Sequence, residues 1–212
     1  MESPLPIVPA FYLERVARLL ADGQRKLLGL VGPPGAGKSS LAAALRLAYA
    51  ERAQVVPMDG FHLATVELSR LGRAQRKGAP DTFDSAGYAA LLRRIRDQRD
   101  DIVYAPDFRR DLEEPVAGAI AVLPHTRLII TEGNYLLLDE GAWPSAAKLL
   151  DEVWYVEVDD ALRTTRLRRR HEAFGRAPED AEAWVMNTDQ PNAKRIEATR
   201  GRADLTFRWD PC

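Results

Sequence analysis

The sequence is short of cysteine and histidine, and it has no long apolar run. Of its 212 residues, one is a cysteine, Cys212, and three are histidines. A single cysteine excludes an internal disulfide and a cysteine-based zinc site, and His62, His125 and His171 lack the spacing of metal ligands. No apolar run approaches the roughly 20 residues that a membrane span needs. Because residues 1–10 also lack the pattern of a secretory signal, we expect a reducing, cytoplasmic setting and no membrane partner.

The chain also lacks an excess of charge of either sign. Lysine and arginine number 30 against 31 for aspartate and glutamate, so the net charge is −1. With a net charge this close to zero, electrostatic attraction gives no reason to expect binding to nucleic acid. With 46% apolar and 29% charged residues, the composition is that of a globular protein and excludes a disordered or low-complexity chain. The length predicts one α/β domain over residues 1–212 and leaves open whether the protein forms a homodimer.

Short apolar segments alternate with helical patterns along the chain. Strands are expected at residues 26–31, 54–57, 102–105, 127–131, 153–158 and 203–207, with a hairpin or edge strand at 117–123. Helices are expected at residues 11–21, 38–52, 85–98 (capped by Ser85), 161–173, 179–187 and 192–199. This alternation predicts an α/β fold with a doubly wound, mostly parallel sheet covered on both faces. In such folds, ligands bind at the carboxyl ends of the strands.

The string Gly32-Pro33-Pro34-Gly35-Ala36-Gly37-Lys38-Ser39, followed by Ser40, matches the Walker A pattern. The glycines let backbone amides curl around a phosphate, and the following helix adds its positive amino-terminal end. In this pattern Lys38 neutralises phosphate charge and Ser39 ligates Mg²⁺. ATP and Mg²⁺ are therefore the expected cofactors. A plain glycine turn is the alternative, but it does not explain Lys-Ser at the start of the helix.

Three classes of nucleotide-binding protein carry this motif: GTPases, mechanical or assembly ATPases, and small-molecule kinases. A GTPase would carry an Asn-Lys-x-Asp string, and the nearest string here is Asn192-Ala193-Lys194-Arg195. A mechanical or assembly ATPase usually ends its Walker B strand in aspartate, whereas the apolar strand at 127–131 ends in Glu132-Gly133. A small-molecule kinase is favoured, because the chain also offers a candidate base and a cluster of cations. A regulatory ATPase that needs no acceptor remains the alternative.

The candidate base is Asp59, which follows the expected strand at 54–57 and could accept a proton from an attacking hydroxyl or hold a Mg²⁺ water. Its alternative is an ordinary Asp-Gly turn. The cations lie in residues 163–176, which hold six arginines: Arg163, Arg166, Arg168, Arg169, Arg170 and Arg176. Of these, Arg166, Arg169 and Arg170 share a helix face. Such a face could stabilise a transferring phosphoryl group, or it could be a solvated surface or an RNA patch.

Five segments together resemble the phosphoribulokinase, uridine kinase and pantothenate kinase family of P-loop kinases. They are the Walker A loop, Met58-Asp59-Gly60-Phe61-His62, the Lys-Gly-x-Pro-x-x-x-Asp string at 77–84, Glu132-Gly133-Asn134, and Arg166-Leu167-Arg168-Arg169-Arg170-His171. The chain is most similar to the small subgroup labelled fructose transport system kinase-like or nucleoside kinase-like. The resemblance implies a three-layer P-loop fold with an arginine-rich lid at about residues 163–185. It also implies ATP-dependent phosphorylation of a hydroxyl on a small metabolite.

The resemblance also implies roles for single residues. Asp59 matches the catalytic carboxylate, Glu132 the acidic residue near Mg²⁺, and Arg166, with Arg170, the lid arginines that reach ATP. Glu132 could instead be a strand-end residue. Asp84 matches a residue that helps to hold the acceptor, and its alternative is a charge at a helix amino terminus. The further acceptor candidates are His62, Lys77, Tyr104, Phe108, Arg109, Asn134 and Tyr135. The acceptor itself, a sugar, a pantothenate-like compound or a nucleoside, stays open.

Overall fold

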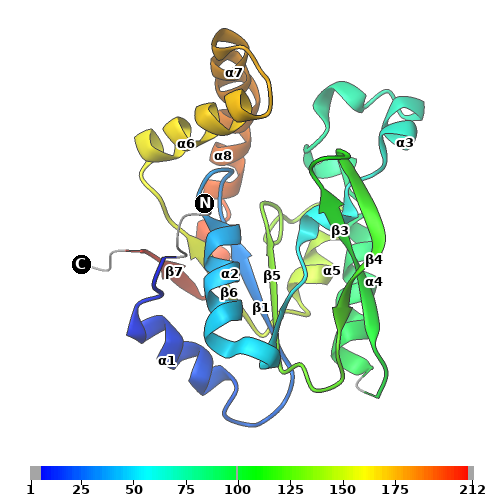
Figure 1. Cartoon of the computed structure of the whole chain (residues 1–212), viewed down its shortest axis with the longest axis vertical. Coiled ribbons are helices and arrows are strands. Elements are labelled where there is room, and N and C mark those ends of the chain that lie inside the picture. The colour runs from blue at the N-terminus through cyan, green and yellow to red at the C-terminus, as the bar shows by residue number, and fades with distance from the viewer. Residues whose placement is uncertain (1–5, 99, 210–212) are drawn as a thin grey trace.

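The computed structural model describes residues 6–98 and 100–209. Cys212 lies outside these residues, as do residues 1–5 of the amino-terminal segment in which no secretory signal was expected. The strands of the central sheet are β1 (Lys26–Val31), β2 (Ala53–Val55), β5 (Leu128–Gly133), β6 (Glu152–Val156) and β7 (Leu205–Phe207). Their spatial order is β2-β5-β1-β6-β7, and every neighbouring pair is parallel (Figure 1). The predicted doubly wound α/β fold is thereby confirmed.

Helices cover both faces of the sheet because successive strand residues point to opposite sides. Leu28 of β1 belongs to one apolar cluster with residues of α1 (Ala10–Leu19) and α2 (Lys38–Tyr49). Leu27, the preceding residue, belongs to the other cluster, with residues of α4 (Ser85–Asp97) and α5 (Trp143–Ala147). The two layers fix the sheet firmly, so its carboxyl edge is a rigid base for a site.

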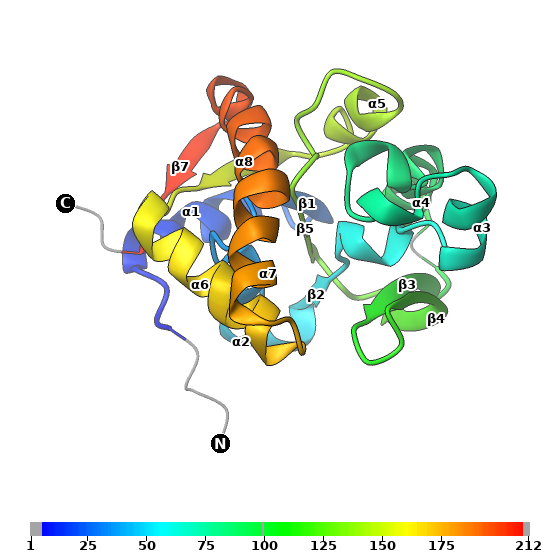
Figure 2. The same cartoon turned by 90° about the horizontal axis from the view of Figure 1, so that it is seen from above.

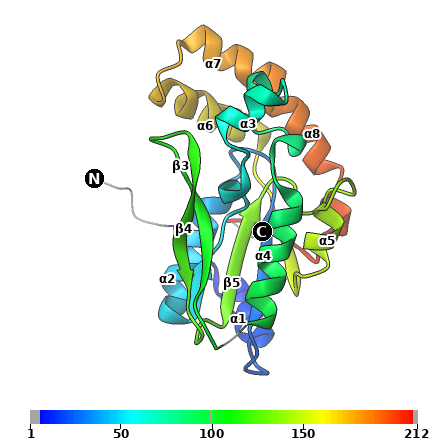
Figure 3. The ribbon, with the colours of Figure 1, turned by 90° about the vertical axis from the view of Figure 1, so that its right-hand side faces the viewer.

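One expectation about the sheet was wrong. The strand predicted at residues 102–105 is present as β3 (Val103–Arg109), but it does not join the parallel sheet. It pairs antiparallel with β4 (Glu114–Val122) to form a separate hairpin (Figure 3). The pattern explains this, because Val103 and Ala105 are buried while Tyr104 between them is exposed. Such a strand buries one face only, whereas a central parallel strand is covered on both.

Two groups of elements rise beyond the carboxyl ends of the strands. One comprises α6 (Asp160–Ala173), α7 (Pro178–Trp184), a π-helical turn (Val185–Asp189) and α8 (Gln190–Glu197). The other comprises α3 (Thr65–Arg70) and the tip of the β3–β4 hairpin, on the opposite side (Figures 1 and 2). We call residues 160–189 the arginine-rich arm.

Short elements and caps complete the chain. Helix α4 is capped by Asp84 rather than by the predicted Ser85, because the Asp84 side chain accepts a hydrogen bond from the Gly87 amide. Within the described residues, no helix is long and apolar enough to cross a membrane. Single 3₁₀ turns lie at Ala50–Arg52, Met58–Phe61, Ala74–Arg76, Pro80–Thr82 and Arg200–Arg202.

Candidate active site

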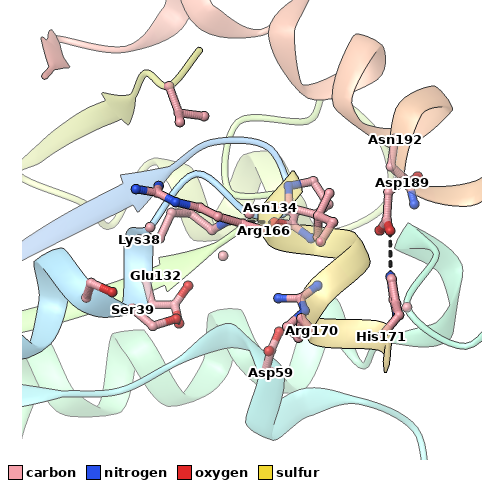
Figure 4. A pocket seen from close by; sticks show the side chains of 18 of the residues that line it. Lys38, Ser39, Asp59, Glu132, Asn134, Arg166, Arg170, His171, Asp189 and Asn192 are labelled. Atoms are coloured by element: carbon pink, nitrogen blue, oxygen red, sulfur yellow. Dashed lines mark hydrogen bonds and ion pairs between the residues drawn. The ribbon is translucent and has the colours of Figure 1, made fainter. Parts of the chain in front are cut away.

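A cleft of about 2000 Å³ lies at the carboxyl ends of β1, β2 and β5, between the arginine-rich arm and the hairpin side. Ligand pockets usually measure about 300–1000 Å³, so this cleft has room for two ligands side by side. Figure 4 shows that side chains from the phosphate loop, from β5 and from the arm point into it. Its geometry is therefore that of a two-substrate site.

The Walker A loop runs from the end of β1 to the start of α2 and lines one end of the cleft. Gly35 and Gly37 have φ angles of +81° and +90°, a region that side chains other than glycine rarely adopt. A side chain at Gly32 would meet the Val156 carbonyl at 2.8 Å. Pro33, Pro34 and Ala36 are buried in the loop, and Ser40 lines the cleft. The loop is thus shaped by its backbone into a cradle before any ligand binds.

Lys38 is buried at the centre of this cradle. Its Nζ donates to the carbonyls of Gly32 (2.9 Å) and Pro33 (3.1 Å) and to Oδ1 of Asn134 (2.8 Å). Burial lowers the pKa of Lys38, and the nearby carboxylates of Glu132 and Asp59 partly offset this effect. The ammonium group is held by neutral oxygens that an anionic phosphate would replace favourably.

Ser39 and Glu132 form a ready pair of oxygen ligands. The Ser39 hydroxyl donates to Oε1 of Glu132 at 2.8 Å, across the gap between α2 and the end of β5. Burial, and then the neighbouring carboxylate of Asp59, raise the pKa of Glu132. The described residues contain no cluster of three His, Cys, Asp or Glu that could hold a metal ion by itself. Mg²⁺ commonly binds through one or two protein oxygens plus substrate phosphates, so Ser39 and Glu132 fit it.

Asp59 faces this pair from the 3₁₀ turn that follows β2. Gly60 packs so tightly against the Pro106 carbonyl that no side chain fits there, and this contact joins the turn to the hairpin. Asp59 Oδ2 lies 3.9 Å from the guanidinium of Arg110. Sequence reasoning missed Arg110 and chose Arg109, which pairs instead with Asp111 at 2.8 Å and does not line the cleft. Side chains two positions apart in a strand lie on the same face, so the choice of Phe108 would have favoured residue 110 over residue 109.

Aromatic rings form the wall beyond Asp59. The His62 ring lies between Phe83 and Phe108, with centroid distances of 4.0 and 4.6 Å. His62 Nδ1 is 2.7 Å from the Asp59 carbonyl, and burial lowers the pKa of His62. The Lys77 ammonium lies 5.4 Å from the centroid of the Phe108 ring and donates to Thr65 Oγ1 and the Glu113 carbonyl. The predicted residues His62, Lys77 and Phe108 therefore do line one end of the cleft.

Four predicted acceptor residues do not line the cleft: Asp84, Tyr104, Arg109 and Tyr135. Asp84 caps α4, which was the alternative for it, and Tyr104 is 55% exposed on the outer face of the hairpin. Tyr135 is buried, and its hydroxyl donates to the Gly78 carbonyl at 2.5 Å. It supports the wall from behind by its edge contact with Phe83.

The arginines of the arm have different surroundings. Arg166 and Arg170, one helical turn apart on α6, both line the cleft, while Arg169 is exposed and does not. Burial, and then the charge of Arg110, lower the pKa of Arg170. Arg163 is almost fully buried; it pairs with Asp160 of the same helix at 2.6 Å, and its Nη1 donates to the Pro34 carbonyl at 3.4 Å, which joins the arm to the phosphate loop. Of the three arginines predicted to share a helix face, Arg166 and Arg170 thus line the cleft and Arg169 does not.

Trp209 lies at the nucleotide end of the cleft and was not singled out from the sequence. Its indole Nε1 is 3.5 Å from where a side chain at Gly37 would stand, and its ring packs on the edge of Phe207. Trp209 and Arg166 both line this end of the cleft. The sequence around Trp209 does not predict a role in the site, because a tryptophan that follows a short strand is equally often a core residue.

Comparison with known proteins identifies the family. No protein-family model matches the chain. It is 38% identical over 185 residues to a Schizosaccharomyces pombe protein provisionally named uridine kinase C227.14, covering 83% of this chain and 78% of that one. It is also 38% identical to the ATP-dependent kinase-like protein notR' of Aspergillus versicolor, over 68% of this chain and 88% of that one.

Solved structures agree with the sequence relatives. A protein of Silicibacter sp. TM1040, provisionally described as a fructose transport system kinase, matches with 40% identity and a TM-score of 0.80, over 87% of this chain and 90% of that one. YFH7 of Saccharomyces cerevisiae is 19% identical and shares the fold, with a TM-score of 0.81 over 96% of this chain and 100% of that one. With the phosphate cradle and these relatives in place, the chain belongs to the uridine kinase family of P-loop kinases.

Proposed function

We propose that this kinase transfers the γ-phosphoryl group of Mg²⁺·ATP to a hydroxyl of a small metabolite. The observation that carries the proposal is one cleft in which Asp59 faces the Ser39–Glu132 pair, beside the buried ammonium of Lys38. The carboxylates of Asp59 and Glu132 lie at the ends of the neighbouring strands β2 and β5, so one can act as the base while the other holds the metal. The cleft has room for a nucleotide and an acceptor at once.

In this proposal Asp59 is the general base. Its carboxylate would orient the acceptor hydroxyl and take its proton as the oxygen attacks phosphorus. The Arg110 guanidinium lies 3.9 Å from this carboxylate and would help to orient it toward the acceptor. Lys38 and the loop amides would hold the β- and γ-phosphates. Asn134, freed when Lys38 turns to phosphate, would be left to bond the acceptor.

Ser39 and Glu132 would hold the metal, Ser39 directly and Glu132 directly or through a water. When bound, Mg²⁺ would supply positive charge that stabilises the phosphates during transfer. Glu132 is buried with a raised pKa, so it binds a cation in competition with a proton. Asp59, the third metal candidate, would serve as the base and at most contact a metal-bound water.

The arginine-rich arm would act as the lid. Arg166 and Arg170 would close on the phosphates and exclude water, which limits futile hydrolysis. Trp209 and the backbone around Val158 would receive the nucleotide base at the other end. We place the acceptor against His62, Phe83 and Phe108, and we take a sugar, a pantothenate-like compound or a nucleoside as its class, in a cytoplasmic setting without nucleic acid.

A coupled assay of ADP release with Mg²⁺·ATP and an acceptor panel tests the proposal. The panel holds pantothenate, uridine, cytidine, fructose and ribulose 5-phosphate, and the phosphorylated product is identified by mass. Stimulation by one acceptor supports the kinase reaction and names the acceptor class. Slow ADP release that does not respond to any acceptor would favour the alternative, a regulatory ATPase, in which Arg166 and Arg170 would bind phosphate without transfer.

A further inference from the structure

Asp189 is a buried carboxylate at the last position of the π-helical turn, on the inner side of the arginine-rich arm. We infer that Asp189 is a positioning residue that, through His171, holds Arg170 at the γ-phosphate. The inference rests on the proposed function, because it assigns a task to the arm that closes over ATP. Asp189 and His171 both line the cleft, and Figure 4 shows the contact between them beside Arg170.

The π-helical turn explains why Asp189 points inward. The chain runs from α7 into α8 as helix, interrupted only by Val185–Asp189. A π turn inserts an extra residue and shifts the faces of the helix on either side, and such turns are frequent at functional sites. Here it leaves Asp189 only 6% exposed. An aspartate is almost never buried this far without a partner, and its partner is His171, whose Nε2 lies 2.8 Å from Oδ2.

Helix α6 depends on polar contacts for its position. Of its residues only Arg163 and Leu167 are buried, so little apolar surface fixes it. Its first half is tied to α8, because Arg163 Nη2 donates to Gln190 Oε1 at 2.5 Å. The contact between His171 and Asp189 ties down its last half. Two adjacent residues, Asp189 and Gln190, therefore hold both ends of the helix that carries Arg166 and Arg170.

Arg170 is the side chain that this arrangement serves. It precedes His171 in the chain and is partly buried, and the carboxylates of Asp189, Asp59 and Glu132 all act on its charge. Within the described part of the chain it makes no ion pair, so no carboxylate contact fixes its place. Arg166 lies near Gly37 in the phosphate loop, and Arg170 lies one helical turn farther toward Asp59. That order puts Arg170 at the transferring phosphoryl group and makes its position sensitive to the end of α6.

Calorimetric binding to the full chain tests the inference without an acceptor. The probes are the Mg²⁺ complexes of ADP and of adenylyl imidodiphosphate, a non-hydrolysable triphosphate. Arg170→Ala should weaken triphosphate binding about tenfold or more, the scale of a lost charged hydrogen bond, and leave ADP within about twofold. Asp189→Ala should weaken triphosphate binding about three- to tenfold, also with ADP little changed. In the Arg170→Ala background, Asp189→Ala should add nothing further, because the side chain it positions is gone.

Two more variants separate positioning from folding. Asp189→Asn keeps the shape and one acceptor oxygen for His171, so it should recover most of the triphosphate affinity. Arg168, on the same helix as Arg170, makes an exposed ion pair with Glu182 of α7; Arg168→Gln breaks this pair and should bind both probes as the wild type does.

Full additivity of Asp189→Ala and Arg170→Ala, equal losses for ADP and triphosphate, or no effect of Asp189→Ala would each overturn the inference. If the coupling holds while no acceptor is phosphorylated, the positioning role stands and the proposed kinase reaction fails. If an acceptor is phosphorylated but the two substitutions are not coupled, the proposed kinase reaction stands and the positioning role of Asp189 fails.

Discussion

Replacing Asp59 with asparagine should separate phosphoryl transfer from nucleotide binding. The change keeps the shape of the side chain and removes the oxygen that accepts a proton. General-base catalysis contributes about 10²- to 10⁴-fold, which corresponds to about 3–5 kcal/mol in the barrier. We therefore expect the kcat for transfer to fall by at least about a hundredfold.

The effect of the same substitution on nucleotide binding should be small. Asp59 and Arg110 are 3.9 Å apart, and their side chains are 35% and 52% exposed. For a pair this open to solvent, measured ion-pair contributions are about 0–1 kcal/mol, far below the Coulomb energy at that distance in a dry site. Loss of the Asp59 charge should also lower the pKa of Glu132, because the Asp59 carboxylate is one of the groups that raise it, and this favours the charged form of the proposed metal ligand. The Kd for Mg²⁺·ADP should therefore change by less than about fivefold.

The assay pairs transfer to the acceptor found in the panel, followed by mass, with calorimetric binding of Mg²⁺·ADP. Asp111→Asn is the matched control, because Asp111 is a nearby carboxylate that pairs with Arg109 and does not line the cleft. It should leave both quantities within about twofold. Transfer within about tenfold of wild type in Asp59→Asn would refute the base assignment. A loss of ADP affinity as large as the loss of kcat would show that Asp59 serves the nucleotide.

Three further predictions concern the rest of the cleft. Lys38→Ala removes a buried donor of three hydrogen bonds and should lower triphosphate affinity and kcat by about tenfold or more each, measured against the exposed Lys148→Ala. Trp209→Ala should weaken ADP and ATP alike by about tenfold, the scale of lost base stacking, without changing the KM for the acceptor; an unchanged ADP affinity would place the base elsewhere. Burial lowers the pKa of His62 below its ordinary 6.5, so the unfolded chain takes up a proton first as the pH falls. The free energy of unfolding should then fall with pH below about 6.5, and less so in His62→Gln, as urea titrations at several pH values would show.

The nucleotide half of the site was predictable because it is set by local rules. Glycines at positive φ, a buried strand before them and a helix after them leave few backbone paths, and that path itself makes the phosphate cradle. The positions of Glu132 and Asp59 in the cleft follow a similar rule, since Glu132 lies at the carboxyl end of β5 and Asp59 lies in the turn after β2. The fold class followed from alternation alone.

The acceptor half of the site depends on contacts between distant segments, which a local sequence pattern does not predict. Tyr104 and Arg109 were expected in the site because they lie near the end of the strand predicted at residues 102–105. In the hairpin, Phe108 and Arg110 line the cleft while Tyr104 is exposed, because the pairing register shifts between Ala105 and Asp107 and breaks the simple alternation. Asp84 likewise follows its local role as a helix cap. Only the pairing of β3 with β4 decides these directions, and it joins residues too far apart for a periodic pattern to show.

This division of the cleft explains why the names of relatives do not transfer. The phosphate cradle is built by backbone, so chains that share it hold nucleotide phosphates in the same way whatever their acceptor. The acceptor wall is built by side chains from the 74–83 segment and the hairpin, and here Phe83 and Phe108 flank His62 while Lys77 lies over Phe108. The wall, and not the cradle, is therefore where the substrate of this chain is decided.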